Sequence, residues 1–214
     1  KFGAPYESDI LFKYRFMADF GLKGMGWIKV EGKPTKTTSV KCKPIEAEKI
    51  EPIEILENAP LKILALDIEC VPEEDRIAIP GKDPIVMMSL AFSQDYKGFK
   101  NLVLLSKPTS INKDVIGFDN EKAMMERFLD IMQEYDPDVV TGYNINNFDL
   151  PYILTRLEVL NLPLDIGRSE KSSSVRKMYQ KMMFGSIPSI SGRVVVDSYE
   201  IIKRDPWVKY KRYN

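Results

Sequence analysis

The sequence contains no histidine and only two cysteines among its 214 residues. The lack of histidine excludes the Ser-His-Asp triad, histidine general bases and histidine-containing zinc sites. Cys42 and Cys70 are too few for a disulfide framework or a four-thiolate metal centre. The lack of histidine and the scarcity of cysteine therefore exclude several common classes of hydrolase and metalloprotein.

Neither sign of charge is in excess, because 31 lysines and arginines balance 31 aspartates and glutamates. Bulk charge therefore gives no argument for or against nucleic-acid binding, since a local groove can still be basic. The sequence also lacks a long apolar run and a signal-peptide pattern, so no membrane partner is expected. With 44% hydrophobic and 29% charged residues, the composition suits one sizeable hydrophobic core and a second, smaller one.

One short stretch, LKILALDIE at residues 61–69, organises the rest of the chain. Its apolar run, bounded by Pro60 and Pro72, predicts a strand that is buried on both faces and ends in Asp67 and Glu69. Because strand side chains alternate, both carboxylates point to the same face, about 7 Å apart at roughly 3.3 Å per residue. A divalent cation between them would relieve their repulsion and desolvation. Alternatively, the two acids merely mark where the strand reaches water.

The first 60 residues predict a separate region before this strand. A helix is expected with Ser8 or Asp9 as its N-cap and Gly21 as its C-cap. It is followed by a short strand at residues 27–30, a polar loop or lysine-guarded edge strand at 32–43, and an extended connector at 46–57.

From residue 61 the pattern predicts an α/β layer. The expected elements are strands at 61–69, 85–92 and 100–105, a helix at 120–135, a strand at 139–142, a helix at 150–160, an irregular insertion with a hairpin at 165–192, a strand at 192–197, and a helix from 198 that Pro206 ends. Asp119 or Asn120 can cap the first helix, and Pro151 suits the first turn of the second. Three consecutive strands imply antiparallel hairpins. The element order is that of an RNase-H-like mixed sheet with flanking helices.

Carboxylates stand at the ends of several of these elements. Asp67 and Glu69 end the first strand, Asp149 precedes a helix, and Asp197 closes the last strand. Such acids suit two hard divalent ions roughly 4 Å apart, which activate water and stabilise a leaving oxygen. No histidine base is then needed, because the metal lowers the pKa of bound water. The same chemistry also fits a kinase-like or phosphatase-like site.

Several of these residues also have a structural interpretation. Asp149 fits the N-cap of its helix, which is the better interpretation of that residue taken alone, and Asp197 fits the cap of the last helix. Asn144 fits a turn, and Phe148 fits the core. Tyr143 and Phe148 are also candidates for stacking on bases, the usual way to hold a single strand.

Three motifs carry a resemblance to a known family. ALDIEC at 65–70, PDVVTGYNINNFDLPYI at 137–153 and GRVVVDSYEII at 192–202 resemble the proofreading domain of family B replicative DNA polymerases. The second motif is similar to that of delta-type eukaryotic and archaeal replicative enzymes. The opening PYESDILFKYRFMADFGLKGMGWI resembles the region just before that domain. The resemblance thus divides the chain into part of an N-terminal domain at 1–60 and an exonuclease domain at 61–214.

The resemblance implies a DEDD exonuclease fold and a role for each motif residue. Asp67 would bridge two metal ions, Mg²⁺ or Mn²⁺, Glu69 would orient the attacking water, and Asp149 matches the second-motif acid. Asn144 and Phe148 match residues that hold the end of a frayed primer strand. The implied reaction is 3′ to 5′ removal of a mispaired nucleotide within a DNA-directed DNA polymerase.

The implied partners are a primer–template, a single-stranded 3′ end, the rest of a polymerase chain and a sliding clamp, in the nucleoid or the nucleus. One departure is that the third motif of the family, Tyr-x-x-x-Asp, is absent; Tyr210 comes nearest, with Asn214 in the acid's place. In the family this motif lies beyond the point where this sequence stops, so we expect little or no exonuclease activity from these residues alone. The alternatives are a standalone RNase-H-like nuclease and a non-catalytic module that binds single-stranded nucleic acid.

Overall fold

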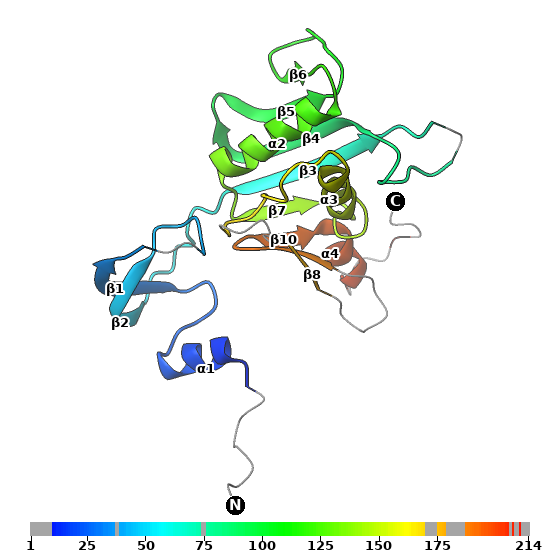
Figure 1. The fold of residues 1–214 in the computed structure, drawn as a ribbon. Helices are drawn as coiled ribbons and strands as arrows, with labels where there is room; N and C mark the ends of the chain where they lie inside the picture. Colours follow the sequence, from blue (N-terminus) through cyan, green and yellow to red (C-terminus); the bar gives the residue numbers. More distant parts are fainter. Residues whose placement is uncertain are drawn as a thin grey trace, which may run out of the picture. The chain divides into compact units, whose positions relative to one another are not determined.

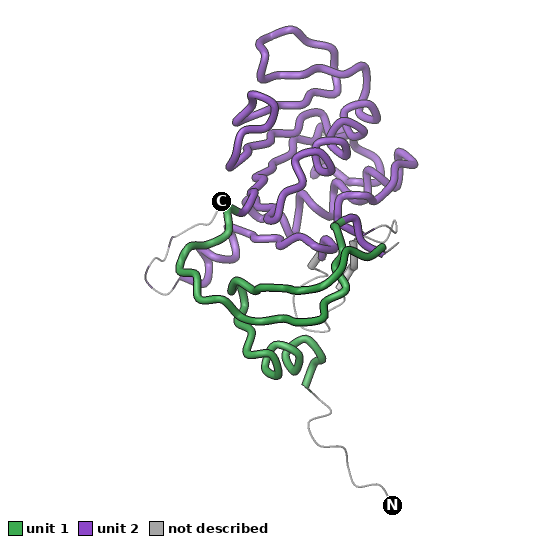
Figure 2. The backbone as a smooth tube through the Cα atoms, turned by 90° about the vertical axis from the view of Figure 1, so that its left-hand side faces the viewer, with its two compact units in different colours: residues 1–38, 42–60 green, residues 39–41, 61–214 purple. Residues whose placement is uncertain are grey.

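The computed structural model describes residues 10–36, 39–73, 76–169, 175–178, 187–205, 207 and 210. The chain divides into two compact units, coloured separately in Figure 2. Unit 1 comprises residues 1–38 and 42–60, and unit 2 comprises residues 39–41 and 61–214. The polymerase-type N-terminal domain expected over residues 1–60 stays a prediction.

The described helix of unit 1 is α1 (Phe12–Asp19), and a left-handed residue follows its C-cap. Gly21 has φ of 63°, and its N–H and that of the next residue bond carbonyls in the last helical turn. This is the Schellman arrangement, in which glycine avoids the steric cost of a Cβ. The N-cap position belongs to Leu11; Ser8 and Asp9, the predicted caps, lie outside the described residues.

The rest of unit 1 is an antiparallel ribbon of β1 (Trp27–Pro34) and β2 (Ile45–Ile53). The prediction of an extended connector is wrong, because most of that segment is the strand β2. The strand predicted to start at Trp27 continues to Pro34. Residues of opposite charge, such as Lys29 and Glu51, face each other across an exposed ribbon. Its sequence therefore lacks the apolar alternation that would reveal two strands.

Unit 2 is built on one mixed sheet with strand order β10-β7-β3-β4-β5-β6 (Figure 1). Its elements are β3 (Ile63–Cys70), β4 (Ile85–Tyr96), β5 (Phe99–Leu105), β6 (Val115–Gly117), α2 (Glu121–Tyr135), β7 (Val139–Gly142), α3 (Asp149–Val159), β8 (Val175–Met178), β9 (Ile187–Ile190), β10 (Val194–Asp197) and α4 (Ser198–Arg204). The strands β3, β4 and β5 are antiparallel, whereas β10, β7 and β3 run parallel. The predicted mixed sheet with flanking helices is thus confirmed.

Three details of unit 2 can be compared with the prediction. The strand β6 was not predicted, because three residues are too few to show a period. The predicted hairpin in the insertion is confirmed as the antiparallel pair β8–β9. The last helix ends at Arg204, and Pro206 lies outside the described residues.

No helix within the described ranges has the length and apolar character needed to cross a membrane.

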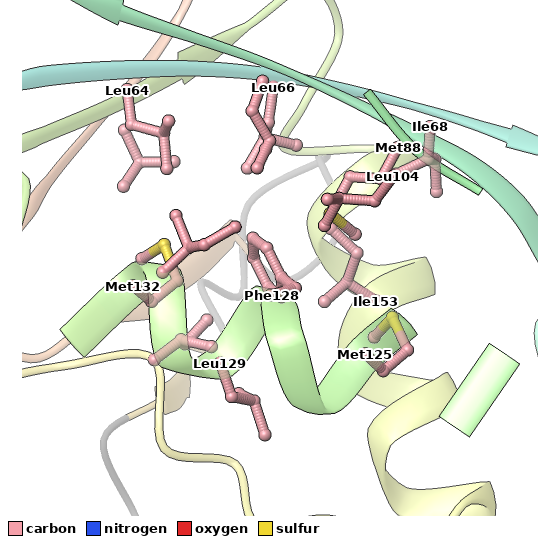
Figure 3. Packing of buried hydrophobic residues seen from close by; sticks show 14 of the residues in the cluster. Leu64, Leu66, Ile68, Met88, Leu104, Met125, Phe128, Leu129, Met132 and Ile153 are labelled. Carbon is pink, nitrogen blue, oxygen red and sulfur yellow. The ribbon is translucent and has the colours of Figure 1, made fainter. Parts of the chain in front are cut away.

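The core of unit 2 lies between β3 and the helices α2 and α3. Leu64, Leu66 and Ile68 of β3 are buried and point toward Phe128 of α2 and Ile153 of α3 (Figure 3). The prediction that this strand is buried on both faces is wrong. The alternate positions lie on the opposite face, where the first residue of β3 is 38% exposed. Period-two burial of this kind leaves the odd-numbered positions, Asp67 and Glu69 among them, on the accessible face.

The helix α2 begins at a side-chain cap that gives a testable prediction. Asn120 has extended backbone angles, and its Oδ1 accepts the N–H of Ala123 at 2.9 Å. Asn120→Ala should lower the free energy of unfolding by about 1 kcal/mol, because that N–H loses its partner. Urea unfolding followed by circular dichroism measures the loss. Asp119→Ala, which changes the other predicted cap, should stay within about 0.5 kcal/mol; a larger effect there would reassign the cap.

Candidate functional site

The end of β3 carries the first two predicted site residues. Asp67 and Glu69 are exposed, and they lie on one face because the buried Ile68 stands between them. The strand β7 pairs with β3 only over Ile63–Ala65. After Leu66, no strand of the described residues pairs with this side of β3. The backbone N–H of Ile68 therefore needs a partner from elsewhere.

Asp149 supplies that partner. It is the first residue of α3, 2% exposed, and its Oδ1 accepts the Ile68 N–H at 3.1 Å. The N-cap position belongs to Phe148, whose side chain has no acceptor. The interpretation of Asp149 as the N-cap is therefore wrong. Its carboxylate instead lies against the strand segment between Asp67 and Glu69.

Burial and charge both act on the Asp149 carboxyl. Burial raises its pKa, and the negative charges of Asp67 and, more weakly, Asp197 raise it further, to about 6. A charged Asp149 is thus placed where it is poorly solvated and repelled by a neighbour. A bound cation would relieve both effects.

The three carboxylates offer only oxygen ligands, which suit a hard divalent cation. Within the described ranges, however, no three acidic or cysteine side chains are gathered closely enough to hold a metal ion by themselves. Mg²⁺ commonly takes one or two protein carboxylates and completes its shell with water and substrate phosphates. The donor set therefore fits an ion that a phosphate-bearing substrate helps to hold.

A tight loop, residues 143–148, connects β7 to α3 and carries the remaining predicted residues. Asn144 has φ of 60°, the left-handed conformation that asparagine tolerates better than most residues. Its carbonyl accepts the N–H groups of Asn147 and Phe148, both at 3.1 Å. The turn interpretation of Asn144 is thus confirmed.

The aromatic residues of this loop are accessible. Tyr143 is 44% and Phe148 is 38% exposed, so the interpretation of Phe148 as a core residue is wrong. The ring centroids of Phe148 and Tyr152 are 5.5 Å apart, and those of Tyr143 and Tyr199 are 5.6 Å apart in a T-shaped arrangement. The ammonium of Lys203 lies 5.3 Å from the Tyr199 centroid. Exposed rings with a nearby cation suit the binding of single-stranded nucleic acid.

Asp197 and Gly142 also shape the site. The carboxylate of Asp197 caps α4 through the Tyr199 N–H, as predicted, but it also accepts two N–H groups of the loop, which sequence spacing does not reveal. Sequence reasoning missed Gly142. A Cβ there would stand 2.7 Å from the Leu66 carbonyl oxygen, so only glycine lets the end of β7 approach β3 this closely. A glycine just before the loop was the available signal.

These features define an RNase-H-like α/β domain with carboxylates at the end of its central strand. The chain belongs to the family described as DNA polymerase family B, exonuclease domain, which residues 3–214 match. The resemblance noted in the sequence is thereby confirmed. Exonuclease domains of this family generally depend on divalent metal ions.

Individual relatives agree with this assignment. The chain is 32% identical over 99% of its length to a DNA polymerase of Archaeoglobus fulgidus, and 33% identical over 95% to the DNA polymerase delta catalytic subunit of Caenorhabditis elegans. It spans only 23% and 21% of those two proteins. The solved family B DNA polymerase of Pyrobaculum calidifontis matches 97% of the chain with a TM-score of 0.67 and 29% identity, over 24% of its own length.

Proposed function

We propose that this chain is the proofreading part of a longer DNA polymerase and that it acts on single-stranded 3′ ends of DNA. The observation that supports the proposal most is the position of Asp149. This acid is buried against β3 between Asp67 and Glu69, and its pKa is raised by burial and by Asp67. A second acid beside a buried carboxylate raises the energy of its charged form, and a bound cation would relieve this cost.

In this proposal Asp67, Glu69 and Asp149 would hold Mg²⁺ or Mn²⁺, two ions in the complete domain. When bound, the ions would lower the pKa of a coordinated water and place positive charge at the leaving oxygen. Glu69, on the accessible face of β3, orients the water that attacks the terminal phosphodiester. Hydrolysis then releases a nucleoside monophosphate and leaves a new 3′ hydroxyl on the primer.

The loop between β7 and α3 selects the substrate. Tyr143 and Phe148 are exposed and suitably placed to stack on unpaired bases, and Asn144 lies between them in sequence. A mismatched end is preferred because it costs less to unpair than a matched one. In the polymerase, a primer–template, the rest of the chain and a sliding clamp would be the partners, in the nucleus or the nucleoid.

The test measures binding rather than cleavage, because these residues include no Tyr-x-x-x-Asp motif and should degrade DNA weakly at most. A 5′-labelled oligodeoxythymidylate with a free 3′ end is titrated by fluorescence anisotropy, with and without Mn²⁺ or Mg²⁺. We expect the metal to tighten binding about tenfold or more, because it screens carboxylates that otherwise repel phosphate. Asp67→Ala should remove this metal dependence.

The control is Asp130→Ala, which removes an exposed acid of α2 and should leave the metal dependence unchanged. A non-catalytic binding module would give a different pattern. Its binding would not respond to either metal, and Asp67→Ala would bind as well as the parent. That result would contradict the proposal. Strong degradation of the strand that is lost in Asp67→Ala would instead show that the third motif is dispensable.

A further inference from the structure

We propose that Asp197 is a positioning residue for the single-strand site, because it fixes the loop that carries Asn144 and Phe148. The inference rests on the proposed function and assigns a role to a carboxylate outside the set that would hold metal. Asp197 ends β10, which lies beside β7 with Asp197 opposite Gly142, the residue that precedes the loop.

Asp197 is 4% exposed, and both of its oxygens are used. Oδ1 accepts the N–H of Asn144 at 2.9 Å and that of Tyr199 at 3.0 Å. Oδ2 accepts the N–H of Asn146 at 3.0 Å. Two of these three bonds therefore go to the loop, from a residue 53 and 51 positions away in the sequence.

The loop is fixed where its backbone is least favourable. Asn144 is in the left-handed region, which is sparsely populated for residues with a side chain and persists only where the surroundings determine it. The carbonyl of Asn144 accepts the N–H of Phe148, and the carbonyl of Ile145 accepts that of Leu150 at 3.0 Å. The hydrogen bonds that fix the backbone at Asn144 therefore also fix the position of Phe148, which lies one short turn further along the chain.

The two ends of the loop are held by two buried acids. Asp197 binds its first residues, and Asp149, directly after the loop, binds the Ile68 N–H of β3. A helix cap alone needs one acceptor, which serine, threonine or asparagine supplies equally well. Only a carboxylate offers acceptors on both oxygens, so the use of both oxygens by Asp197 indicates a role beyond the cap.

The variant Asp197→Asn separates these roles. The amide oxygen can still cap α4, but the NH₂ group then faces a backbone N–H of the loop and accepts nothing. The oxygen that caps α4 also accepts the Asn144 N–H, so Asn146 is the amide that loses its acceptor, and we expect faster hydrogen exchange there. We also expect roughly tenfold weaker binding of the 3′-ended oligodeoxythymidylate in Mn²⁺, since a charge-assisted hydrogen bond is lost at the binding loop. If this variant does not fold, Asp197→Ser keeps the cap, and the same result is expected.

Two further variants exclude a general structural effect. Asp138→Asn changes a carboxylate that accepts the Lys62 N–H at 2.9 Å and pairs with Arg168 at 2.8 Å, next to the opposite end of β7. Its binding of the oligonucleotide should stay within about twofold of the parent. In a Phe148→Ala background, Asp197→Asn should cause little further loss, because a positioning residue acts through the side chain it positions.

The outcomes separate this inference from the proposed function. In one contradicting outcome, Asp197→Asn binds the oligonucleotide like the parent although amide exchange in the loop is faster. In another, its loss of binding affinity simply adds to that of Phe148→Ala. In either case Asp197 does not position the binding loop, and the proposed function stands. If the parent itself does not bind the 3′ end in the presence of metal, the proposed function fails and the inference fails with it.

Discussion

Replacing Arg156 by methionine is expected to lower the free energy of unfolding by about 3–5 kcal/mol, because it leaves the Glu121 carboxylate buried without its cation. The side chains of Arg156 and Glu121 are only 7% and 9% exposed. Methionine retains much of the volume of arginine, so the loss would report the missing charge rather than a cavity. It would exceed the effect of removing any surface ion pair.

The pair is bidentate and connects several elements. Arg156 of α3 donates from Nε to Glu121 Oε1 at 2.8 Å and from Nη2 to Oε2 at 2.5 Å. Its Nη1 donates to the carbonyl of Pro80 at 3.0 Å. Glu121, at the start of α2, also accepts the N–H of Ile85 at 2.8 Å. The bond to Glu121 raises the pKa of the guanidinium above its ordinary value, so Arg156 stays charged.

Urea unfolding of the parent, the Arg156→Met variant and two controls measures the effect. Adding Glu121→Gln to Arg156→Met should recover much of the loss, because the amide oxygen still accepts the Ile85 N–H and no buried charge remains. Arg204→Met breaks an exposed pair with Glu200 and should change stability by less than about 0.5 kcal/mol. A similarly small loss for Arg156→Met would mean that the carboxylate is solvated in solution.

This pair also affects the candidate site, because Arg156 follows Asp149 by seven residues, about two turns, on the same helix. Between them, the Tyr152 hydroxyl donates to the carbonyl of Asp83 at 3.0 Å. These contacts fix α3 along its length. They thereby hold the Asp149 carboxyl against the Ile68 N–H of β3. We therefore expect the burial of Asp149 to depend on the Arg156–Glu121 pair.

Nothing in the sequence distinguishes Arg156 from an arginine on the outer face of a helix. The helix α2, whose apolar residues follow a helical period, and the strand β3, whose apolar run lies between two prolines, were predicted within two residues of their limits. The helix α3, indicated by a proline in its first turn, was predicted equally closely. The ribbon β1–β2 was not, because its strands are held by backbone pairing and charged cross-strand neighbours rather than by a buried face. Periodicity reports burial, so it misses elements that bury little.

In the candidate site, too, some features could be predicted from the sequence and others could not. The i,i+2 spacing of Asp67 and Glu69 was enough to place both on one face of β3, because strand geometry depends only on local backbone. Taken alone, Asp149 favoured a helix cap, and its assignment to the site depended on the other carboxylates and on the family motif. The short ladder between β7 and β3, which leaves the Ile68 N–H for Asp149, depends on tertiary contacts. For the same reason, only the cap half of the Asp197 contacts was predictable.

Asp149→Asn is expected to make the metal-free protein more stable at pH 8, by on the order of 1–2 kcal/mol, because the buried charge and its repulsion by Asp67 disappear. The pKa of Asp149 rises from 3.8 to about 6 on folding. A carboxyl with a raised pKa favours the folded state while it is protonated, and this contribution is lost as the pH rises from about 3.8 to about 6. The stability of parent and variant should therefore be similar near pH 4, diverge as the pH rises to about 6, and stay apart at higher pH.

The difference between the two proteins isolates Asp149 from acids that act in the opposite direction. A hydrogen bond from Arg76 lowers the pKa of Asp83 to about 2, and one from Tyr96 lowers that of Glu134 to about 2. These two groups stabilise the fold above their unfolded pKa values, and the contribution is lost as the pH falls toward 2. They are present in both proteins, so their effect cancels. Thermal unfolding from pH 4 to 8, with Asp130→Asn as a control for the change in formal charge, gives the comparison.

Addition of metal should reverse the order of stability. If Asp149 binds Mn²⁺ with Asp67, metal at about 100 times its dissociation constant stabilises the parent by about 2.7 kcal/mol, whereas Asp149→Asn gains less. The parent would then be the more stable protein at pH 8. A variant less stable than the parent in the absence of metal would show that the bond to the Ile68 N–H outweighs the cost of the buried charge. Asp149 would then be an anchor of α3, and the case for a metal-binding role would lose its main physical support.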